Sequence, residues 1–259
     1  MINIAVHPKA KIAENVVIEP FTYISEHVEI GEGTWIGPNV TIFDYVRIGK
    51  NCKIFPGAVL GAVPQDLKFA GEETYVEIGD NTTIRECVTI NRGTAASGKY
   101  KTVVGSNCLI MSYVHIAHDC RVSDNCVFSS YAAIAGETDV DEWAILGGGA
   151  LVHQFTHIGA HSMLGGGSAT SKDIPPYILS ARNPASYEGI NIVGLRRRGF
   201  SNTDIEEIHN IYRILMESNL MVTEACNQIR EQLPESRHKQ VILDFIANSK
   251  RGIIKKDSK

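Results

Sequence analysis

The stretch that decides the fold runs from residue 28 to residue 49 and reads VEIGEGTWIGPNVTIFDYVRIG. Within it an isoleucine recurs at every sixth position, as Ile30, Ile36, Ile42 and Ile48. An α-helix cannot turn a period of six into one apolar stripe, because its own period is about 3.6 residues. A short strand followed by a tight turn can do so. The stretch therefore predicts a chain that repeats a strand and a turn every six residues.

The same period extends through most of the chain. Every sixth residue from Val6 to Leu60 is Val, Ile or Leu, and the pattern returns at Ile78 and again from Val104 to Leu164. Glycine or another small residue often follows the aliphatic one, as a tight corner requires. Three such units would close one triangular coil of about 18 residues, and coils would stack about 4.8 Å apart. The pattern predicts a mainly β protein, a parallel β-helix of hexapeptide repeats.

Bulk composition excludes some classes of function. The net charge is −4 and 21% of residues are charged, so no global basic field favours nucleic-acid binding. The first residues lack the basic-then-apolar build of a secretory signal. No apolar run approaches the roughly 20 residues that span a bilayer. We expect a cytoplasmic protein without stable membrane insertion.

The cysteines fit the repeat rather than a metal site or a disulfide framework. No C-x-x-C spacing occurs, and Cys87 and Cys226 show no metal-type spacing. The other four occupy the fifth, inward-pointing position of the hexad, where small side chains otherwise sit, and we interpret them as core residues; they are Cys52, Cys108, Cys120 and Cys126.

Two interruptions of the period predict loops that leave the coil, near residues 62–77 and 95–103. The walls of a solenoid have little room for chemistry, so functional side chains are expected to collect in such loops. The first interruption contains PQDLKFAGE, which exposes Asp66 and Lys68. An ordinary solvated surface loop is the alternative.

The C-terminal part changes period. We expect residues 1–190 to form the β-helix and residues 191–259 a helical domain. Prolines at 175, 176 and 184 predict an extended cover over the last coils, through NIVGLRRRGF. Ser201 and Asp204 then resemble a helix capping box, followed by apolar residues at helical spacing. Two further helices are expected at about 223–233 and 235–250.

The stretch MSYVHIAHDC, residues 111–120, places polar groups on this frame. His118 and Asp119 follow the inward Ile116, and one coil later Gly136 and Glu137 hold the same two places. Beside Val152, a further coil on, lie His153 and Gln154. We therefore expect His118, Gly136 and His153 on one edge of the prism, the outer two about 10 Å apart.

Three interpretations of this edge remain open. The histidines could be solvated corner residues, or neutral imidazoles that bind zinc. Alternatively, His118 is a general base whose tautomer is set by the carboxylate of Asp119. In that case Gly136 would let a backbone N–H approach a developing oxyanion, and the activated hydroxyl would belong to the substrate.

Several motifs together resemble one family. QDLKFAGE, IRECVTINRGT, HIAHDC, VHQF, IGAHSMLGGGSATSKDIPPY and NIVGLRRRGFS are similar to the UDP-N-acetylglucosamine acyltransferases that start lipid A synthesis. The resemblance implies a left-handed coil and a homotrimer with active sites between neighbouring prisms. It also implies transfer of a 3-hydroxyacyl chain from acyl carrier protein to the glucosamine 3-hydroxyl of UDP-GlcNAc, without a metal or cofactor.

The resemblance also implies residue roles. His118 matches the general base, Asp119 its carboxylate partner and Gly136 the oxyanion donor. A glycine at 166 implies an open groove and an acyl chain of about C14 or longer. Where some relatives carry histidine and glutamate, this chain has Glu137 and Val193. The implied substrate contacts are Asp66, Lys68, His115, His153, Gln154, Asn191 and Arg197.

The acidic carrier protein would favour a basic docking patch, for which Arg196–Arg198 and Lys250–Lys256 are the candidates. A solvated cationic segment is the alternative for the second.

Other activities stay open: an acetyl-CoA-dependent O-acetyltransferase, a zinc hydratase, or a non-catalytic scaffold. The related N-acyltransferase normally carries an N-terminal uridine-binding domain, for which a repeat that begins at Val6 leaves no room.

Overall fold

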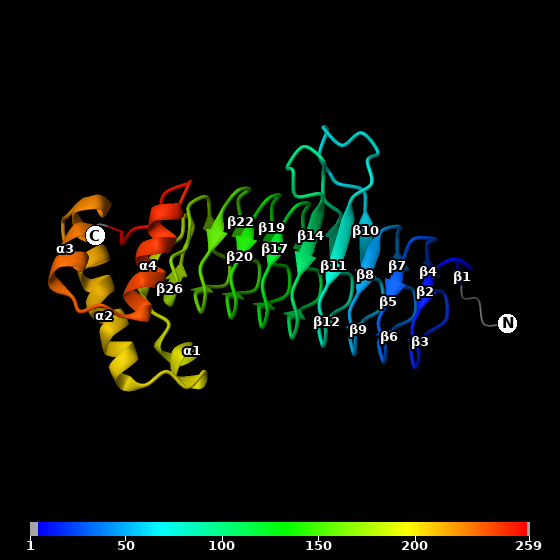
Figure 1. The fold of residues 1–259 in the computed structure, drawn as a ribbon, viewed down its shortest axis with the longest axis horizontal. Helices are drawn as coiled ribbons and strands as arrows, with labels where there is room; N and C mark the ends of the chain where they lie inside the picture. The colour runs from blue at the N-terminus through cyan, green and yellow to red at the C-terminus, as the bar shows by residue number, and fades with distance from the viewer. Residues whose placement is uncertain (1–4, 258–259) are drawn as a thin grey trace.

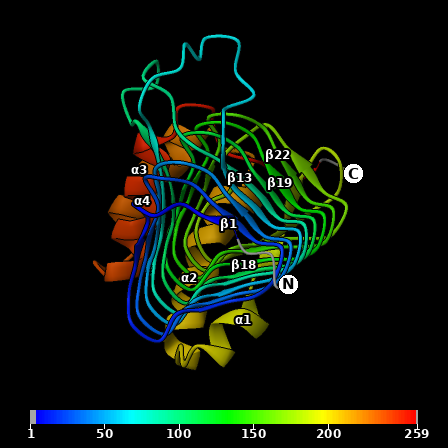
Figure 2. The same ribbon diagram turned by 90° about the vertical axis from the view of Figure 1, so that its right-hand side faces the viewer.

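Residues 5–257, the part of the chain that the computed structural model describes, form a long coil of short strands followed by four helices (Figure 1). The strands wind as a left-handed parallel β-helix of triangular cross-section (Figure 2). The helices gather at the C-terminal end of the coil. The expected fold class, a mainly β left-handed helix with C-terminal helices, is confirmed.

The chain visits three parallel sheets in turn, and we call them faces A, B and C. Face A contains β1 (Ala5–Val6), β4 (Tyr23–Ile24), β7 (Thr41–Ile42), β10 (Val59–Ala62), β13 (Thr89–Asn91), β16 (His115–Ile116), β19 (Ala133–Ile134), β22 (Leu151–Val152) and β25 (Ala169–Thr170). Face B contains β2 (Lys11–Ile12), β5 (Glu29–Ile30), β8 (Val46–Ile48), β11 (Tyr75–Ile78), β14 (Lys101–Val104), β17 (Arg121–Val122), β20 (Asp139–Val140) and β23 (His157–Ile158). Face C contains β3 (Val17–Ile18), β6 (Trp35–Ile36), β9 (Lys53–Ile54), β12 (Thr83–Ile84), β15 (Leu109–Ile110), β18 (Val127–Phe128), β21 (Ile145–Leu146), β24 (Met163–Leu164), β26 (Ile178–Ala181) and the antiparallel β27 (Ser186–Ile190).

Three edges join the faces, and we call them AB, BC and CA after the faces that meet there. Both interruptions of the period lie on the AB edge, since each follows a strand of face A. The first loop spans residues 63–74, between β10 and β11, and the second spans residues 92–100, between β13 and β14. They project from the coil next to each other (Figures 1 and 2).

The inside of the prism is the core. The aliphatic residues of the hexad stack in register from coil to coil, as in the pairs Ile90–Ile116 and Ile116–Ile134, and these three side chains are fully buried. Each such side chain contributes about 1.5–3 kcal/mol by leaving water. The four cysteines of the fifth position are buried too, Cys226 is buried and Cys87 is half-buried, and all six are free thiols. The prediction of small core residues without disulfides holds for the inward four.

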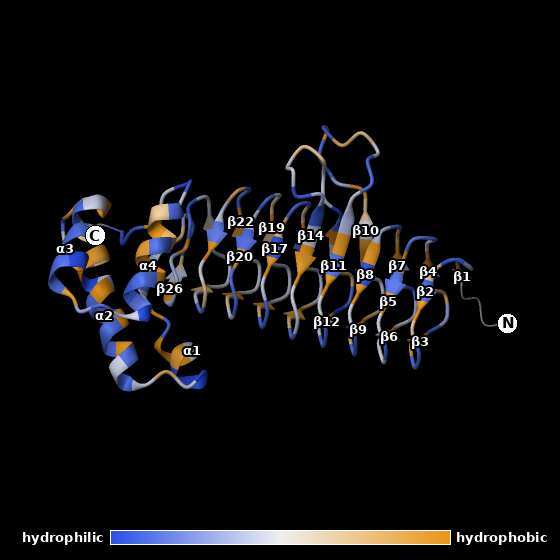
Figure 3. Ribbon diagram, viewed as in Figure 1, coloured by the Kyte–Doolittle hydropathy of each residue, from blue (hydrophilic) through white to orange (hydrophobic). Residues whose placement is uncertain are grey.

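Three of the helices agree with the sequence pattern. α2 (Asn202–Glu217) begins with the expected capping box, in which Ser201 and Asp204 bond to each other's backbone N–H. α3 (Val222–Gln232) and α4 (Arg237–Asn248) end within two residues of the expected positions. Apolar and hydrophilic residues alternate along all three in Figure 3, as they should in helices with one buried face. No helix within residues 5–257 is long and apolar enough to cross a membrane.

The expectation that the extended cover continues through NIVGLRRRGF is wrong for residues 192–197. Residues 192–197 form the helix α1 (Ile192–Arg197). The Asn191 side chain caps it by accepting a hydrogen bond from the Gly194 N–H, and Leu195 is buried beneath it. The prolines that argued against a helix end at Pro184, so they place no restriction on this segment.

Candidate active site

His118, which is half-buried, and the fully buried Asp119 form a pair on the AB edge, just after β16. His118 Nδ1 lies 2.7 Å from Asp119 Oδ2, and Asp119 is fully buried. A carboxylate oxygen can only accept, so Nδ1 donates and the free lone pair is on Nε2. Asp119 has a φ of +60°, the left-handed turn that brings its side chain back to its neighbour. The pair has the geometry of a base with its orienting carboxylate.

The electrostatics of this pair favour a proton on the imidazole. The hydrogen bond to Asp119 raises the pKa of His118 above its ordinary 6.5, and the charges of Asp119, Asp66 and Glu137 add to that effect against burial. Burial opposes ionisation of Asp119, but hydrogen bonds from His118, Ser97 and Thr94 outweigh it and lower the pKa of that carboxyl. Near neutral pH Asp119 is therefore charged, and the imidazolium that forms during proton transfer is stabilised.

The second loop holds the carboxylate of Asp119, which sequence reasoning missed. Oδ1 accepts from the Thr94 N–H at 2.8 Å and from Ser97 Oγ at 2.6 Å, while Oδ2 also accepts from Thr94 Oγ1 at 2.8 Å. With His118, the carboxylate has four donors. The motif RGT, residues 92–94, was visible in the sequence, but no spacing rule connects it to a residue 25 positions later.

Gly136 lies one coil beyond His118, under the imidazole. A Cβ at residue 136 would come within 2.5 Å of His118 Nε2, so only glycine leaves room for the ring. This steric role is additional to the one inferred from the sequence. The Gly136 N–H has no acceptor among the described residues, while the next N–H, that of Glu137, bonds to the His118 carbonyl at 3.0 Å.

His153 shares the AB edge with His118 and Gly136, as expected, because β16, β19 and β22 are successive strands of face A. The register requires one correction. Ile134 pairs with Val152, so Gln154, and not His153, holds the turn position of Gly136 and His118. His153 is one residue earlier. Both side chains are exposed, and His153 Nδ1 lies 3.2 Å from the Gln154 carbonyl oxygen.

Three other expected site residues also lie near His118. His115, on the outer side of β16, has its Nδ1 2.7 Å from Thr89 Oγ1, and burial and His118 lower its pKa. Asp66, in the first loop, places Oδ2 3.9 Å from His118 Nε2. The exposed Lys68 follows in the same turn, where its N–H donates to Asp66 Oδ1. The first loop therefore brings a carboxylate close to Nε2 of His118, the ring nitrogen that Asp119 does not bind.

Asn191, Arg197 and Gly166 are not brought to His118 within one chain. Asn191 Nδ2 donates to the carbonyl of His161, which follows β23 on the BC edge, and the exposed Arg197 ends the helix that Asn191 caps. Gly166 follows β24 and is exposed on the CA edge. Figure 2 shows α1 well away from the two loops. The expected residues thus occupy all three edges of the prism.

The faces differ sharply in chemistry. Face B carries ion pairs between neighbouring coils, such as Lys11 with Glu29 at 2.8 Å. The register-aligned outward residues of faces A and C include one charged side chain, Lys53. The outward residues of face B are Lys11, Glu29, Arg47, Glu77, Val103, Arg121, Asp139 and His157. Those of faces A and C are Ala5, Tyr23, Thr41, Val59, Thr89, His115, Ala133, Leu151, Ala169, Val17, Trp35, Lys53, Thr83, Leu109, Val127, Ile145, Met163 and Leu179.

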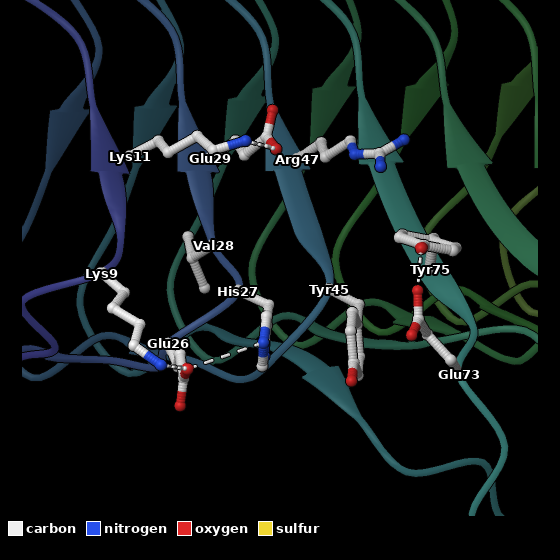
Figure 4. A pocket seen from close by; sticks show the side chains of 10 residues that line it. All are labelled: Lys9, Lys11, Glu26, His27, Val28, Glu29, Tyr45, Arg47, Glu73 and Tyr75. Atoms are coloured by element: carbon white, nitrogen blue, oxygen red, sulfur yellow. Dashed lines mark hydrogen bonds and ion pairs between the residues drawn. The ribbon is translucent and has the colours of Figure 1, made fainter.

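A hollow of about 410 Å³ near the N-terminal end is distant from this chemistry. Two of its cations are already paired with its anions, Lys9 with Glu26 and Lys11 with Glu29 (Figure 4). A second hollow, of about 300 Å³, lies on face A beside His153.

Within residues 5–257 no three His, Cys, Asp or Glu side chains are arranged to hold a metal ion, so the zinc interpretation has no ligand cluster to support it there.

Comparison with known proteins agrees with this geometry. Residues 173–254 match the family described as "Udp N-acetylglucosamine O-acyltransferase; Domain 2". The chain is 61% identical, over 193 residues, to a protein of Chlorobaculum tepidum named acyl-[acyl-carrier-protein]–UDP-N-acetylglucosamine O-acyltransferase, covering 74% of this chain and 72% of that one. The chain belongs to the UDP-N-acetylglucosamine acyltransferase family.

Solved structures of this acyltransferase family have the same fold over nearly the full length. The Bacteroides fragilis member superposes with a TM-score of 0.95 at 52% identity, covering 97% of this chain and 98% of that one. The Francisella novicida member gives 0.95 at 38% identity, with coverage of 98% and 93%. Residues 9–44, 27–62 and 101–136 match the bacterial transferase hexapeptide family.

Proposed function

We propose that this protein transfers a 3-hydroxyacyl chain from acyl carrier protein to the glucosamine 3-hydroxyl of UDP-GlcNAc, the first step of lipid A biosynthesis. The observation that carries the proposal is the His118–Asp119 pair, held against Gly136 with Nε2 3.9 Å from Asp66 Oδ2 of the first loop. The names of its relatives supply the two substrates. Consistent with the sequence prediction, we expect the enzyme to act in the cytoplasm.

The chain's own groups account for each step of acyl transfer. His118 Nε2 removes the proton of the sugar 3-hydroxyl, and the oxygen attacks the thioester carbonyl. The Gly136 N–H donates to the oxyanion of the tetrahedral intermediate. Collapse of that intermediate forms the ester and expels the carrier's thiolate, which takes the proton back from His118. Asp119 holds the imidazole in the tautomer that this sequence needs.

A homotrimer would complete the site. Faces A and C carry Lys53 as their one register-aligned charge and leave apolar groups in water, such as Leu151 at 53% exposure, whereas face B has ion pairs between its coils. If face A of one copy packs on face C of the next, the CA edges converge on a three-fold axis. The AB edge of one copy then meets the BC edge of its neighbour, which carries Asn191 and Arg197. The separation of these residues within one chain supports this arrangement.

The hollow beside His153 is suited to an acyl chain. It is lined in part by Leu151, Ala169 and Pro184, and it lies on face A, on the way from the AB edge toward the CA edge. Gly166 is exposed on the CA edge. We assign this surface, closed by face C of the next copy, to the fatty chain, with Gly166 limiting its length.

The carrier protein would dock at the C-terminal end of the AB edge. Residues 249–254 return from α4 to the coil, where the Ile254 N–H donates to the Asp173 carbonyl. This return places Arg251 against Ser171, whose carbonyl accepts from the guanidinium Nε at 2.6 Å. Lys172 is exposed beside it. These cations continue the line of His118 and His153, which suits an acidic partner delivering its thioester.

The catalytic proposal is tested by His118→Ala, with His27→Ala as the matched control. His27 lies on the same edge but stacks on Tyr45, far toward the N-terminal end. Each variant is given UDP-GlcNAc and a 3-hydroxyacyl carrier protein, and the product is measured by mass spectrometry. We expect His118→Ala to lower turnover by about 10²-fold or more and His27→Ala to leave it unchanged. Near-normal turnover in His118→Ala would remove the base role.

The assembly is tested with a pair of valines in equivalent strand positions. Val127→Arg puts a charge on face C, and Val103→Arg puts the same charge on face B. We expect Val127→Arg to give a monomer with little activity and Val103→Arg to remain a fully active trimer, measured by light scattering after gel filtration. The packing of face A on face C is wrong if both variants stay trimeric.

A further inference from the structure

The two loops beside His118 are joined by a single carboxylate. Glu72, in the first loop, accepts from the Ala70 N–H at 2.7 Å through Oε2. Its other oxygen, Oε1, accepts from the Ala95 N–H of the second loop at 2.9 Å. The backbone hydrogen bond from Ala95 is the largest of the effects that lower the pKa of Glu72, so the side chain is ionised near neutral pH. The Glu72 carboxylate is therefore a charged connection between the two loops.

On one side, this connection leads to Asp119. Ala95 directly follows Thr94, whose N–H and hydroxyl both donate to the Asp119 carboxylate. The hydroxyl of Ser97, two residues further, donates to the same carboxylate, and the Ser97 N–H donates to the Thr94 hydroxyl within the loop. Fixing the Ala95 N–H therefore fixes the short turn that orients Asp119 toward His118.

On the other side, the connection leads to Asp66. The turn from Asp66 to Ala70 is closed by the Lys68 N–H on Asp66 Oδ1 and the Phe69 N–H on the Asp66 carbonyl. The Arg92 guanidinium lies over the Phe69 ring at 5.4 Å and so also ties this turn to the second loop. Asp66 then presents Oδ2 3.9 Å from His118 Nε2.

We infer that Glu72 is a positioning residue that holds both carboxylates flanking the His118 ring, Asp119 at Nδ1 and Asp66 at Nε2. Its side-chain hydrogen bonds go to Ala70 and Ala95, and none goes to His118. Each of its oxygens controls one loop, so its loss would release both carboxylates at once. The catalytic consequence rests on the proposed function, whereas the effect on His118 does not.

The expected direction follows from the groups that face His118. They are Asp119, Asp66 and Glu137, which stabilise the imidazolium, and His115, whose charge would oppose it. Glu137 and His115 are held by the coil and would stay in place. With the donors around Asp119 loosened and the Asp66 turn freed, the two best-placed anions are less well oriented toward the imidazole, and the midpoint of its titration moves down toward 6.5 or below.

The test compares Glu72→Ala and Glu72→Gln with Glu73→Ala. Glu73 is the adjacent carboxylate, but it bonds to Tyr75 and lies outside the network. The His118 ring C–H is titrated by NMR in the free protein, assigned with His118→Ala, and kcat and KM are then measured against pH. We expect Glu72→Ala to lower the titration midpoint of His118 and to reduce kcat by about 10- to 100-fold. Glu72→Gln, which keeps one acceptor oxygen, should shift both in the same direction by less.

Unchanged His118 titration in both Glu72 variants would overturn the inference, and so would an equal shift in Glu73→Ala. A shifted titration without any acyl transfer in the parent enzyme would leave the positioning role intact and refute the proposed function instead. Thermal unfolding of all three variants shows whether the coil persists. If Glu72→Ala does not fold, the inference is judged on Glu72→Gln alone. A lowered titration midpoint of His118 in that variant supports it, and an unchanged midpoint overturns it.

Discussion

Replacing Asp119 by asparagine exchanges one carboxylate oxygen for a donor in a fully buried place with four donors around it. The backbone N–H of Thr94 cannot turn away, so the remaining oxygen must stay opposite it. The new NH₂ group then faces His118 Nδ1. That nitrogen has to become an acceptor, and the imidazole proton moves to Nε2, where it blocks the removal of the sugar proton.

The size of the effect follows from this wrong tautomer. Restoring a free Nε2 would set two donors against each other and would forfeit a charge-assisted hydrogen bond of about 1.5–3 kcal/mol in a buried site. We expect kcat to fall by about 10³- to 10⁴-fold, which corresponds to about 4–5.5 kcal/mol in the activation barrier. The fold should persist, because all four hydrogen bonds can re-form once the Thr94 hydroxyl rotates and His118 Nδ1 becomes an acceptor.

The assay measures initial rates with saturating UDP-GlcNAc and carrier-bound acyl chain. Asp44→Asn is the control, since Asp44 pairs with His27 toward the N-terminal end of the same edge, and such exposed pairs contribute little. NMR should also show a lower His118 pKa in Asp119→Asn, because the main cause of its elevation is gone. Turnover within about threefold of the parent would refute the assignment of Asp119 as the orienting carboxylate.

Three further outcomes are expected. Because the folded-state pKa of His118 is raised above 6.5 and the base must be neutral, kcat/KM should rise with pH through a midpoint above 6.5; a midpoint below that value would contradict the assigned base. Gly136→Ala should cost about 1–3 kcal/mol in the free energy of unfolding and about 10-fold or more in turnover, since its Cβ would lie 2.5 Å from His118 Nε2; unchanged thermal unfolding and rates would show that the ring does not rest on this glycine. Gly166 has an ordinary backbone conformation, with the nearest atom to an added Cβ being the Gly148 carbonyl oxygen at 3.2 Å. Gly166→Leu should therefore fold and reduce the rate with a long acyl chain far more than with a short one; equal losses would separate Gly166 from chain length.

The local sequence pattern was sufficient to predict much of this fold. Period six fixes which side chains point inward, so the buried stack of Ile90, Ile116 and Ile134 was predictable from spacing. Counting in hexads also placed His118 and Gly136 on one edge. The capping box of Ser201 and Asp204 located the start of α2. In each case the decisive interaction lies within one turn or between residues at a constant separation.

Where the six-residue period is interrupted, the spacing of residues in the sequence no longer predicts where they lie in the fold. Thr94 and Glu72 belong to loops whose contacts with Asp119 and with each other arise from two excursions leaving the same edge. The helix α1 was missed because six residues are too few to show a helical period. The register of His153 and Gln154 needed no tertiary contact, because Gln154 is 18 residues after Gly136, and the strand pairing agrees with that count.

The sequence alone thus determined the prism, its core and the edge that carries His118, since a repeated unit forces every coil to place equivalent residues at equivalent points. Only the tertiary structure decided which other groups surround His118 on that edge. The donors around Asp119, the approach of Asp66 and the distribution of Asn191 and Gly166 over other edges depend on long-range contacts, which no local periodicity encodes.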